Sequence, residues 1–220
     1  MRHAVIWGRR RQGKSTLALA LALASSRKPV VIFDPCEQFR NFASGGPGDL
    51  ALIENSLVRG APEIVRYRVM SEPEIEFAHL MELLDGGNWA WGDYSLIVDE
   101  SSQLQRAQGF HPAIARLIRQ APDDVFVVQT LHRPSETHPT VRALCTDYFF
   151  FQTFLQRDLE VIAGNYGPDV AREVSRLAPY EVLHFWLGDT GAPKWKVWRD
   201  PSLWFVDLRS RDESEVLTDV

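Results

Sequence analysis

The sequence is poor in cysteine and contains no apolar run long enough to cross a membrane. Its two cysteines, Cys36 and Cys145, fit neither a metal-binding spacing nor a disulfide framework, so we expect both to be buried small apolar residues. The Ala/Leu stretch from Leu17 to Ala24 is far shorter than the roughly 20 residues of a membrane-spanning helix. The composition therefore indicates no disulfide scaffold and no transmembrane segment.

Positive charge is scarcer than negative charge. The chain has 24 Lys and Arg against 29 Asp and Glu, a formal net charge of −5, which argues against a protein that coats DNA through a wholly basic surface. Charges at Arg2 and from Arg9 to Arg11 interrupt the region where a secretory signal peptide would need an apolar core. We therefore expect a soluble cytoplasmic protein.

Length and composition indicate one α/β domain. Of the 220 residues, 45% are hydrophobic and 24% are charged, which suits a globular core of that class. No internal repeat or linker divides the chain, so residues 1–200 are expected to form the domain. Residues 201–220 are expected to be a loose tail, in which Trp204 and Phe205 either pack back on the domain or dock a neighbour.

The most informative motif follows the first apolar segment, His3 to Trp7. It reads Gly8-Arg9-Arg10-Arg11-Gln12-Gly13-Lys14-Ser15 and continues through Thr16 into the Ala/Leu-rich stretch. A strand, a Gly-x4-Gly-Lys-Ser loop and a helix in this order are typical of the phosphate-binding loop, or Walker A motif. Backbone N–H groups and the positive end of the helix dipole together make an anion site. We therefore expect residues 8–16 to bind a nucleotide.

Individual residues of this loop have specific expected roles. Gly8 and Gly13 allow backbone turns that other residues resist. Lys14 is expected to contact the β- and γ-phosphates, and the Ser15 hydroxyl is expected to ligate Mg²⁺. ATP and Mg²⁺ are therefore the expected cofactors. The three consecutive arginines, from Arg9 to Arg11, are unusual in such a loop and are expected to touch the nucleotide or a neighbouring subunit.

A second motif, the Walker B pattern, lies near the middle of the chain. The apolar segment Tyr94-Ser95-Leu96-Ile97-Val98 ends in Asp99 and Glu100. Asp99 suits support of Mg²⁺, and Glu100 suits a residue that polarises water for attack on a γ-phosphate. Such a strand end is common alone, but beside a phosphate loop it favours a nucleotide hydrolase.

The remaining hydrophobic patterns predict a mostly parallel central sheet flanked by helices, with a C-terminal β-hairpin. Strands are expected at residues 30–33, 64–70, 125–130 and 148–151, and hairpin strands at 182–187 and 195–198. Helices are expected at residues 13–25, 49–58, 74–84, 111–120, 157–162 and 168–177. Asp34, at the end of a strand, either contacts a ligand at that edge of the sheet or caps a turn.

These motifs together resemble the FtsK–HerA superfamily of RecA-like (ASCE) P-loop NTPases. The resemblance rests on the phosphate loop, on Asp99-Glu100, and on a Thr-x-x-Arg-Pro-Ser segment from Thr130 to Ser135 after the fourth buried strand. The short length most resembles the genome-packaging ATPases of tailless icosahedral viruses with internal membranes. The resemblance implies an α/β RecA-like fold and a homo-oligomeric ring, usually a hexamer, that translocates double-stranded DNA.

The resemblance also assigns roles to residues. Lys14 and Ser15 would bind phosphate and Mg²⁺, Asp99 would support Mg²⁺, and Glu100 would be the catalytic carboxylate. The family usually has Gln directly before Arg-Pro as a γ-phosphate sensor, but His132 stands there in this chain and Gln129 lies three residues earlier. We favour Gln129, because an amide orients water without changing its protonation, and we retain His132 as the alternative.

A ring ATPase of this family also needs an arginine that acts on the neighbouring subunit. Arg119 precedes the fourth buried strand and matches the usual family location, while Arg116 and Arg133 are alternatives. The densest basic run outside the expected ATP site comprises Arg40, Arg59, Arg66 and Arg68. These four residues are candidates to line a DNA pore or are ordinary surface charges.

The resemblance implies further partners and a location. A portal or membrane-vertex protein is a candidate partner, and the host cytoplasm or the virion is the implied location if the source is viral.

Three rival functions fit parts of the sequence. A nucleoside or small-molecule kinase would also use a phosphate loop, with Asp34 as its carboxylate, but Asp99-Glu100 favours hydrolysis and no Arg-rich lid follows. An ATPase for virion assembly or secretion has a similar core but typically carries a membrane span. A regulatory nucleotide switch would not need the complete set of Lys14, Asp99 and Glu100.

Overall fold

The computed structural model describes residues 2–25, 27–46, 48–85, 92–106, 109–188 and 191–201. Most of the expected tail, including Trp204 and Phe205, lies outside the described residues. The strands are β1 (Arg2–Trp7), β2 (Val30–Asp34), β3 (Ile64–Arg68), β4 (Ser95–Val98), β5 (Gln105–Arg106), β6 (Gly109–Phe110), β7 (Phe126–Leu131), β8 (Asp147–Phe151), β9 (Val182–Leu187) and β10 (Pro193–Trp198).

Helices alternate with these strands along the chain. They are α1 (Lys14–Ala24), α2 (Leu50–Arg59), α3 (Pro73–Asp85), α4 (Pro112–Gln120), α5 (Pro139–Leu144), α6 (Gln156–Tyr166) and α7 (Pro168–Arg176). Short 3₁₀ turns follow two strands, at η1 (Ser101–Gln103) and η2 (Pro134–Glu136). Among the described helices, none is both long and apolar enough to cross a membrane.

Eight strands form one sheet in the order β10-β9-β8-β1-β7-β4-β2-β3. From β3 to β8 every neighbouring pair is parallel, and β9 and β10 add an antiparallel hairpin at one edge. The mostly parallel α/β sheet and the C-terminal hairpin predicted from the sequence are therefore confirmed. Because β1, β4 and β7 are parallel neighbours, their carboxyl ends meet at one edge of the sheet.

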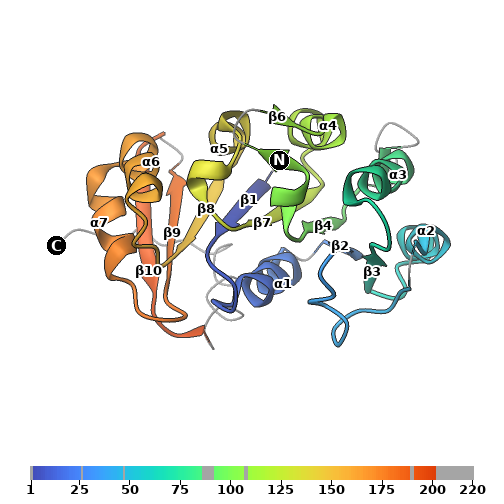
Figure 1. Cartoon of the computed structure of the whole chain (residues 1–220). Helices are drawn as coiled ribbons and strands as arrows, with labels where there is room; N and C mark the ends of the chain where they lie inside the picture. Colours follow the sequence, from blue (N-terminus) through green and yellow to red (C-terminus); the bar gives the residue numbers. More distant parts are fainter. Residues whose placement is uncertain are drawn as a thin grey trace.

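The two faces of the sheet are covered unequally (Figure 1). Helix α1 packs alone among the helices against one face, where Leu17 and Leu21 meet Ile6, Ile97 and Val128 in one apolar cluster. Helices α2 to α7 contribute to the cluster on the opposite face. The uniformly apolar composition of α1 follows, because this helix lies against the sheet along most of its length.

Most predicted elements are present with shifted ends. The predicted strand at 64–70 ends at Arg68, the hairpin strand predicted from Trp195 begins at Pro193, and α6 extends to Tyr166. Sequence patterns did not predict α5 or the small β5–β6 pair, which are too short to show a period. Asp49 and His111 precede their helices as N-caps, with side chains that accept hydrogen bonds from Leu52 N and Ala113 N.

Both edge strands of the sheet, β3 and β10, have features that hinder pairing with a strand of another molecule. On β3, the backbone of Ser44 pairs with Ile64 and Arg66 on the outer side, and a Cβ on Gly45 would lie 2.2 Å from the Arg66 carbonyl oxygen. At the other edge, residues 193–196 of β10, Pro-Lys-Trp-Lys, are exposed. The first edge is thus covered by the chain's own loop, and the second carries proline and lysine.

Candidate active site

The glycine-rich loop between β1 and α1 has the backbone that a phosphate cradle requires. A Cβ on Gly8 would lie 2.8 Å from Phe151 Cβ, so only glycine fits against β8 at that point. Gly13 has φ of 99° and Arg11 has φ of 64°, both in the left-handed region that turns the chain back into α1. The predicted strand, loop and helix are therefore present, with Lys14 as the first residue of the helix.

Hydrogen bonds within the loop hold this shape. The Gln12 side chain accepts from Arg9 N at 2.5 Å and donates to the Gln152 carbonyl at 3.1 Å, which fastens the loop to the segment after β8. Lys14 Nζ donates to the Arg9 carbonyl at 3.2 Å. Burial lowers the pKa of Lys14, while the negative charges of Glu100 and Asp99 act in the opposite direction.

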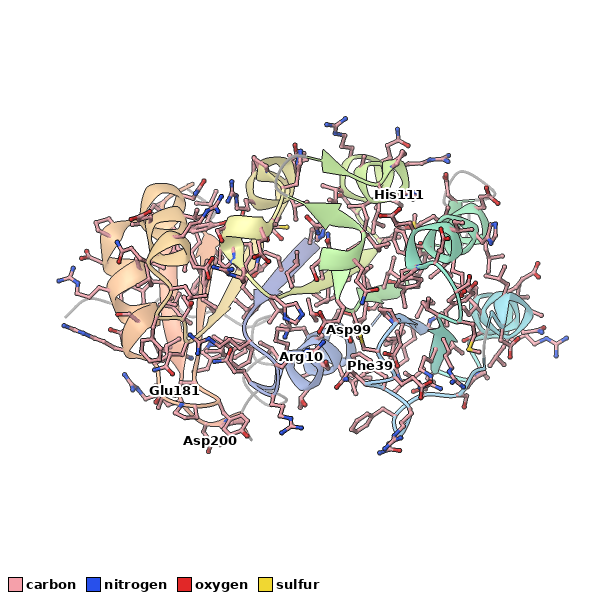
Figure 2. The ribbon with its side chains drawn as sticks, in the orientation of Figure 1. Arg10, Phe39, Asp99, His111, Glu181 and Asp200 are labelled. Carbon is pink, nitrogen blue, oxygen red and sulfur yellow. The ribbon has the colours of Figure 1, made fainter. Side chains whose placement is uncertain are left out.

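Asp99 lies directly beneath the start of α1, at the carboxyl end of β4. Its Oδ1 accepts from Thr130 Oγ1 at 2.6 Å and from Ser15 Oγ at 3.4 Å, so the two predicted Mg²⁺ ligands are adjacent. Asp99 and Arg10 both lie beside the N-terminal end of α1 (Figure 2). Burial raises the pKa of Asp99 to about 6, against the opposing effect of the Thr130 hydrogen bond.

The oxygen atoms at this point fit a magnesium ion. Asp99 Oδ2 is buried, and none of the described residues donates a hydrogen bond to it. A carboxylate and a hydroxyl beside a phosphate cradle are the hard oxygen ligands that Mg²⁺ prefers, since the ion usually takes one or two carboxylates together with substrate phosphates and water. An uncompensated buried carboxylate oxygen is costly, and a bound cation would remove that cost.

Glu100 turns away from the sheet and toward the cleft. Its φ of 48° and ψ of 41° are left-handed, so the chain leaves β4 abruptly and the two adjacent carboxylates share one side. His132 Nε2 lies 2.6 Å from Glu100 Oε2. Burial alone would raise the pKa of Glu100, but the His132 hydrogen bond and the nearby positive charges outweigh it, so the pKa is lowered. Glu100 is therefore held as a carboxylate.

An open cleft of about 810 Å³ joins these groups. Its walls combine the glycine-rich loop, the start of α1 and the Glu100 side chain with residues from elsewhere in the chain. The lining residues are Arg10, Arg11, Gly13, Lys14, Ser15, Thr16, Cys36, Gln38, Glu100 and Tyr180. Arg9 instead places its guanidinium over the Phe154 ring, 5.7 Å from the ring centroid. The volume is within the range of small-molecule sites.

Gln129, the favoured sensor in the sequence, faces the opposite side of the sheet. Its side chain has no exposed surface, and its Oε1 accepts from Ser101 Oγ at 2.7 Å and Gln105 Nε2 at 2.9 Å. Its Nε2 lies 2.6 Å from His3 Nε2. The alternation of β7 explains this, because Thr130 points to the α1 side and Gln129 therefore points away. The half-buried His132 is the residue of the pair that contacts Glu100.

The three candidate arginines differ in their surroundings. Arg116 forms an ion pair with Asp85, and Arg133 contacts Glu136 at 2.9 Å and Asp158 at 3.3 Å. Arg119 is exposed on α4 and does not line the cleft that holds Lys14. A side chain that reaches a neighbouring copy would have to be exposed in this way.

Of the two roles expected for Asp34, its surroundings fit the capping of a turn. Its carboxylate accepts from Gln38 N at 2.9 Å and Phe39 N at 3.0 Å, and it pairs with Arg66 at 3.4 Å. Arg68 pairs with Glu37 at 2.5 Å. Two of the four candidate DNA-contacting arginines are therefore engaged in ion pairs, whereas Arg40 and Arg59 are exposed.

Some residues of the cleft were not found from the sequence. Thr130 was noted only as part of a motif, although period-2 alternation in β7 places it on the face of Asp99. Cys145 is buried as predicted, but Cys36 is half-buried and lines the cleft. Tyr180 lies 165 residues after Ser15 in the chain, and no local pattern connects it to the phosphate loop.

Comparisons with known proteins give a match only at the level of structure. No family model and no curated protein matches the chain. The genome packaging NTPase B204 from Sulfolobus turreted icosahedral virus 2, in complex with AMPPCP, has a TM-score of 0.71 and 19% identity over 88% of this chain and 96% of that chain.

Two further solved structures agree with that match. The DNA-packaging ATPase B204 from Sulfolobus turreted icosahedral virus has a TM-score of 0.71 and 20% identity over 88% of this chain and 96% of that chain. The pCW3 conjugation coupling protein TcpA, with ATPγS, has a TM-score of 0.52 and 13% identity over 96% of this chain and 65% of that chain. These likenesses show that the chain has the P-loop ATPase fold expected from its sequence.

Proposed function

We propose that this chain, which has the fold of viral genome-packaging NTPases, hydrolyses ATP with Mg²⁺ and uses the energy to translocate double-stranded DNA in genome packaging. The observation that carries the ATPase proposal is that Lys14, Ser15 and Glu100 line one cleft and that the buried Asp99 contacts Ser15 directly behind it. The packaging role is supported by the likeness to B204 over nearly the whole length of both chains.

In the proposed reaction, the chain's own residues position ATP and a water molecule. Backbone N–H groups of the loop and Lys14 bind the phosphates, and Ser15 and Asp99 would hold Mg²⁺, which would supply positive charge to neutralise the developing negative charge. Glu100 takes a proton from the attacking water. The water oxygen then bonds to the γ-phosphorus, the bond to the β–γ bridging oxygen breaks, and ADP and phosphate leave.

His132 is the proposed sensor of the γ-phosphate. It contacts Glu100 and is followed directly by Arg133-Pro134, whereas Gln129 is fully buried. A histidine that holds the Glu100 carboxylate in place would change that contact when a γ-phosphate competes for its N–H group. The role proposed for Gln129 from the sequence thus has less structural support than the role of His132.

A kinase is the second candidate function, because it would use the same phosphate loop. A kinase would need Asp34 as a catalytic carboxylate. In the structure the buried Asp34 accepts hydrogen bonds from two backbone N–H groups and forms an ion pair with Arg66. The hydrolase reading is therefore better supported. An assembly ATPase would use the same catalytic groups, and stimulation of turnover by DNA separates a translocase from it.

The decisive experiment measures ATP turnover with and without long double-stranded DNA, at low and moderate salt. We expect turnover to rise with DNA and the stimulation to weaken with salt, because contacts to phosphates release counterions. Glu100→Gln should remove turnover and retain ATP binding. Glu160→Gln, the same change at an exposed site on α6, serves as the matched control. Turnover that is indifferent to DNA would reject the translocase.

We propose that copies of the chain form a homo-oligomeric, hexameric ring, in which Arg119 acts on the ATP of a neighbouring copy. Arg119→Ala should reduce turnover by about 10³- to 10⁵-fold, as for other arginine fingers, and leave ATP binding intact. Mixing Arg119→Ala with Glu100→Gln subunits should restore some turnover, because a mixed interface can pair an intact arginine with an intact glutamate. Normal turnover by purified Arg119→Ala would reject the assignment.

The proposed location and partners follow from the packaging role. The protein would act in the host cytoplasm or on the virion, and a portal or membrane-vertex protein would recruit it. Co-purification of the chain with assembling particles is the measurement that tests this part.

A further inference from the structure

We infer that Tyr180 is the stacking platform for the nucleotide base, in the cleft that the phosphate loop lines. This inference rests on the proposed ATP site and adds the recognition of the base. Tyr180 lines the same cleft as Lys14 and Ser15, and 52% of its surface is exposed. An exposed aromatic ring on the wall of a nucleotide cleft offers a flat apolar surface that any base can stack on.

The backbone conformation of Tyr180 is one that a tyrosine does not favour by itself. Residues Ala178 to Glu181 form a turn closed by a hydrogen bond from Glu181 N to the Ala178 carbonyl at 3.1 Å. Pro179 is second in this turn, and Tyr180 is third with φ of 67°. This is the pattern of a type II turn, whose third residue is normally Gly or Asn because φ is positive there.

An aromatic residue in the left-handed region is unfavourable, and such strain persists where the surroundings impose it and where the side chain has a use. Glycine at position 180 would form the same turn without strain. The stability of the turn therefore does not explain why position 180 is a tyrosine. The place of its ring on the wall of the cleft does explain it.

The turn is fastened on both sides, so the backbone that carries the ring is held in place before any ligand binds. Glu181 Oε2 accepts from Ala178 N at 2.9 Å, and Glu181 Oε1 accepts from Arg199 Nη1 at 3.1 Å. Arg199 also lies 3.8 Å from Glu173 on α7. These contacts join the turn to α7 and to the end of β10, and pre-organisation of this kind lowers the entropic cost of binding.

Sheet register brings the turn to the phosphate loop. Val182 pairs with Phe151 at the end of β8, and the next residue, Gln152, accepts the hydrogen bond from Gln12 in the loop. Tyr180 precedes β9 by two residues, so it lies at the edge of the sheet where the phosphate loop begins. Figure 2 shows its neighbour Glu181 on the same side of the molecule as Arg10.

The test compares binding of ATP with binding of inorganic triphosphate, both with Mg²⁺, to the wild type and to Tyr180→Gly. We expect wild type to prefer ATP, and Tyr180→Gly to lose roughly 5- to 150-fold in ATP affinity, the range for one base–aromatic stack. Triphosphate affinity should stay unchanged. Tyr180→Phe, which keeps the ring, should bind ATP as wild type does.

Stability separates the base-binding role from a structural one. Tyr180→Gly relieves the positive φ, so its unfolding midpoint should be equal to or higher than that of wild type. A lower midpoint with equal losses for ATP and triphosphate would mean that Tyr180 only supports the fold, and would overturn the inference. Unchanged ATP affinity would also overturn it. If wild type binds triphosphate and ATP with equal affinity, the base site is rejected and the proposed ATP site stands. If wild type binds neither, the proposed ATP site is rejected as well.

Discussion

Two buried polar clusters lie back to back across β7, and they differ in what completes them. The cleft cluster contains Thr130, Asp99, Ser15, Glu100 and His132. The core cluster contains Gln129, His3, Ser101 and Gln105. Neighbouring residues of one strand, Thr130 and Gln129, supply one side chain to each cluster.

The core cluster makes most of its hydrogen bonds among its own members, and its unpartnered buried atoms within the described residues are His3 Nδ1 and Gln105 Oε1. Gln129 Oε1 accepts two hydrogen bonds, so its Nε2 is the donor to His3 Nε2, and His3 must be neutral with its proton on Nδ1. The cleft cluster instead leaves Asp99 Oδ2 without a donor among the described residues. The unpartnered core atoms belong to neutral groups, whereas the unpartnered cleft atom is a carboxylate oxygen beside Ser15. The comparison therefore indicates that one cluster specifies the packing of the core while the other offers a position for a cation.

The largest expected effect comes from changing the cleft cluster at Asp99. Asp99→Asn should lower ATP turnover by about 10²- to 10³-fold, because support of the metal supplies several kcal/mol of transition-state stabilisation. The same change should raise the free energy of unfolding by about 1 kcal/mol, because it removes a buried charge with an unpaired oxygen. Steady-state turnover and urea unfolding at neutral pH measure the two effects. Loss of both activity and stability would place Asp99 with the core cluster instead.

The next effect concerns acid stability and the core cluster. Burial lowers the pKa of His3 to about 3, whereas an unfolded histidine titrates near 6.5. Between these values the unfolded chain binds a proton that the native chain does not. The free energy of unfolding should therefore fall as pH falls from about 6.5 toward about 3, by at most ~1.4 kcal/mol per pH unit.

His3→Gln isolates this contribution, because its amide oxygen can accept from Gln129 without titrating. Urea unfolding of wild type and His3→Gln across that pH range should give a steeper slope for wild type. Equal slopes would show that other groups control acid stability and that His3 is not held neutral.

The smallest of these effects should follow from Gln129→Ala. The change removes one hydrogen-bond partner each from Ser101, Gln105 and His3, while Gln105 Nε2 still donates to Ser101 Oγ at 2.6 Å. The expected cost is about 1–3 kcal/mol in the free energy of unfolding. Turnover per folded molecule should stay at the wild-type level. A large loss of turnover in a well-folded Gln129→Ala protein would restore Gln129 as the γ-phosphate sensor and remove the contrast between the clusters.

The sequence predicted the fold and the strand, glycine-rich loop and helix of the expected phosphate site, because both depend on local patterns. The apolar strand before Gly8 and the apolar helix after Gly13 define the loop without tertiary information, and the strand ending at Asp99 is defined in the same way. The choice between Gln129 and His132 depended on which face of β7 each side chain takes. Alternation along β7 puts Gln129 and Thr130 on opposite faces, but which of the two faces meets the phosphate loop is set by packing across the sheet, and the apolar residues on both faces of β7 do not reveal it.

Contacts between distant segments were beyond the reach of sequence patterns. Tyr180 joins the cleft through the pairing of β9 with β8, and Arg66 is drawn into the core by Asp34. An arginine such as Arg66, on a strand of alternating polarity, is predicted to be a surface charge unless its partner, here Asp34, is known. The roles of such residues depend on distant partners and could not be predicted from single positions in the sequence.

The protected edges of the sheet also bear on how copies of this chain associate. A free strand edge recruits other strands, which leads to open-ended growth and precipitation. Here one edge is occupied by the chain's own segment around Ser44, and the proline and lysines of β10 oppose addition at the other. Within the described residues, the sheet therefore offers little for a strand of another copy to pair with, and a ring of the proposed kind would have to be held together by helices and loops.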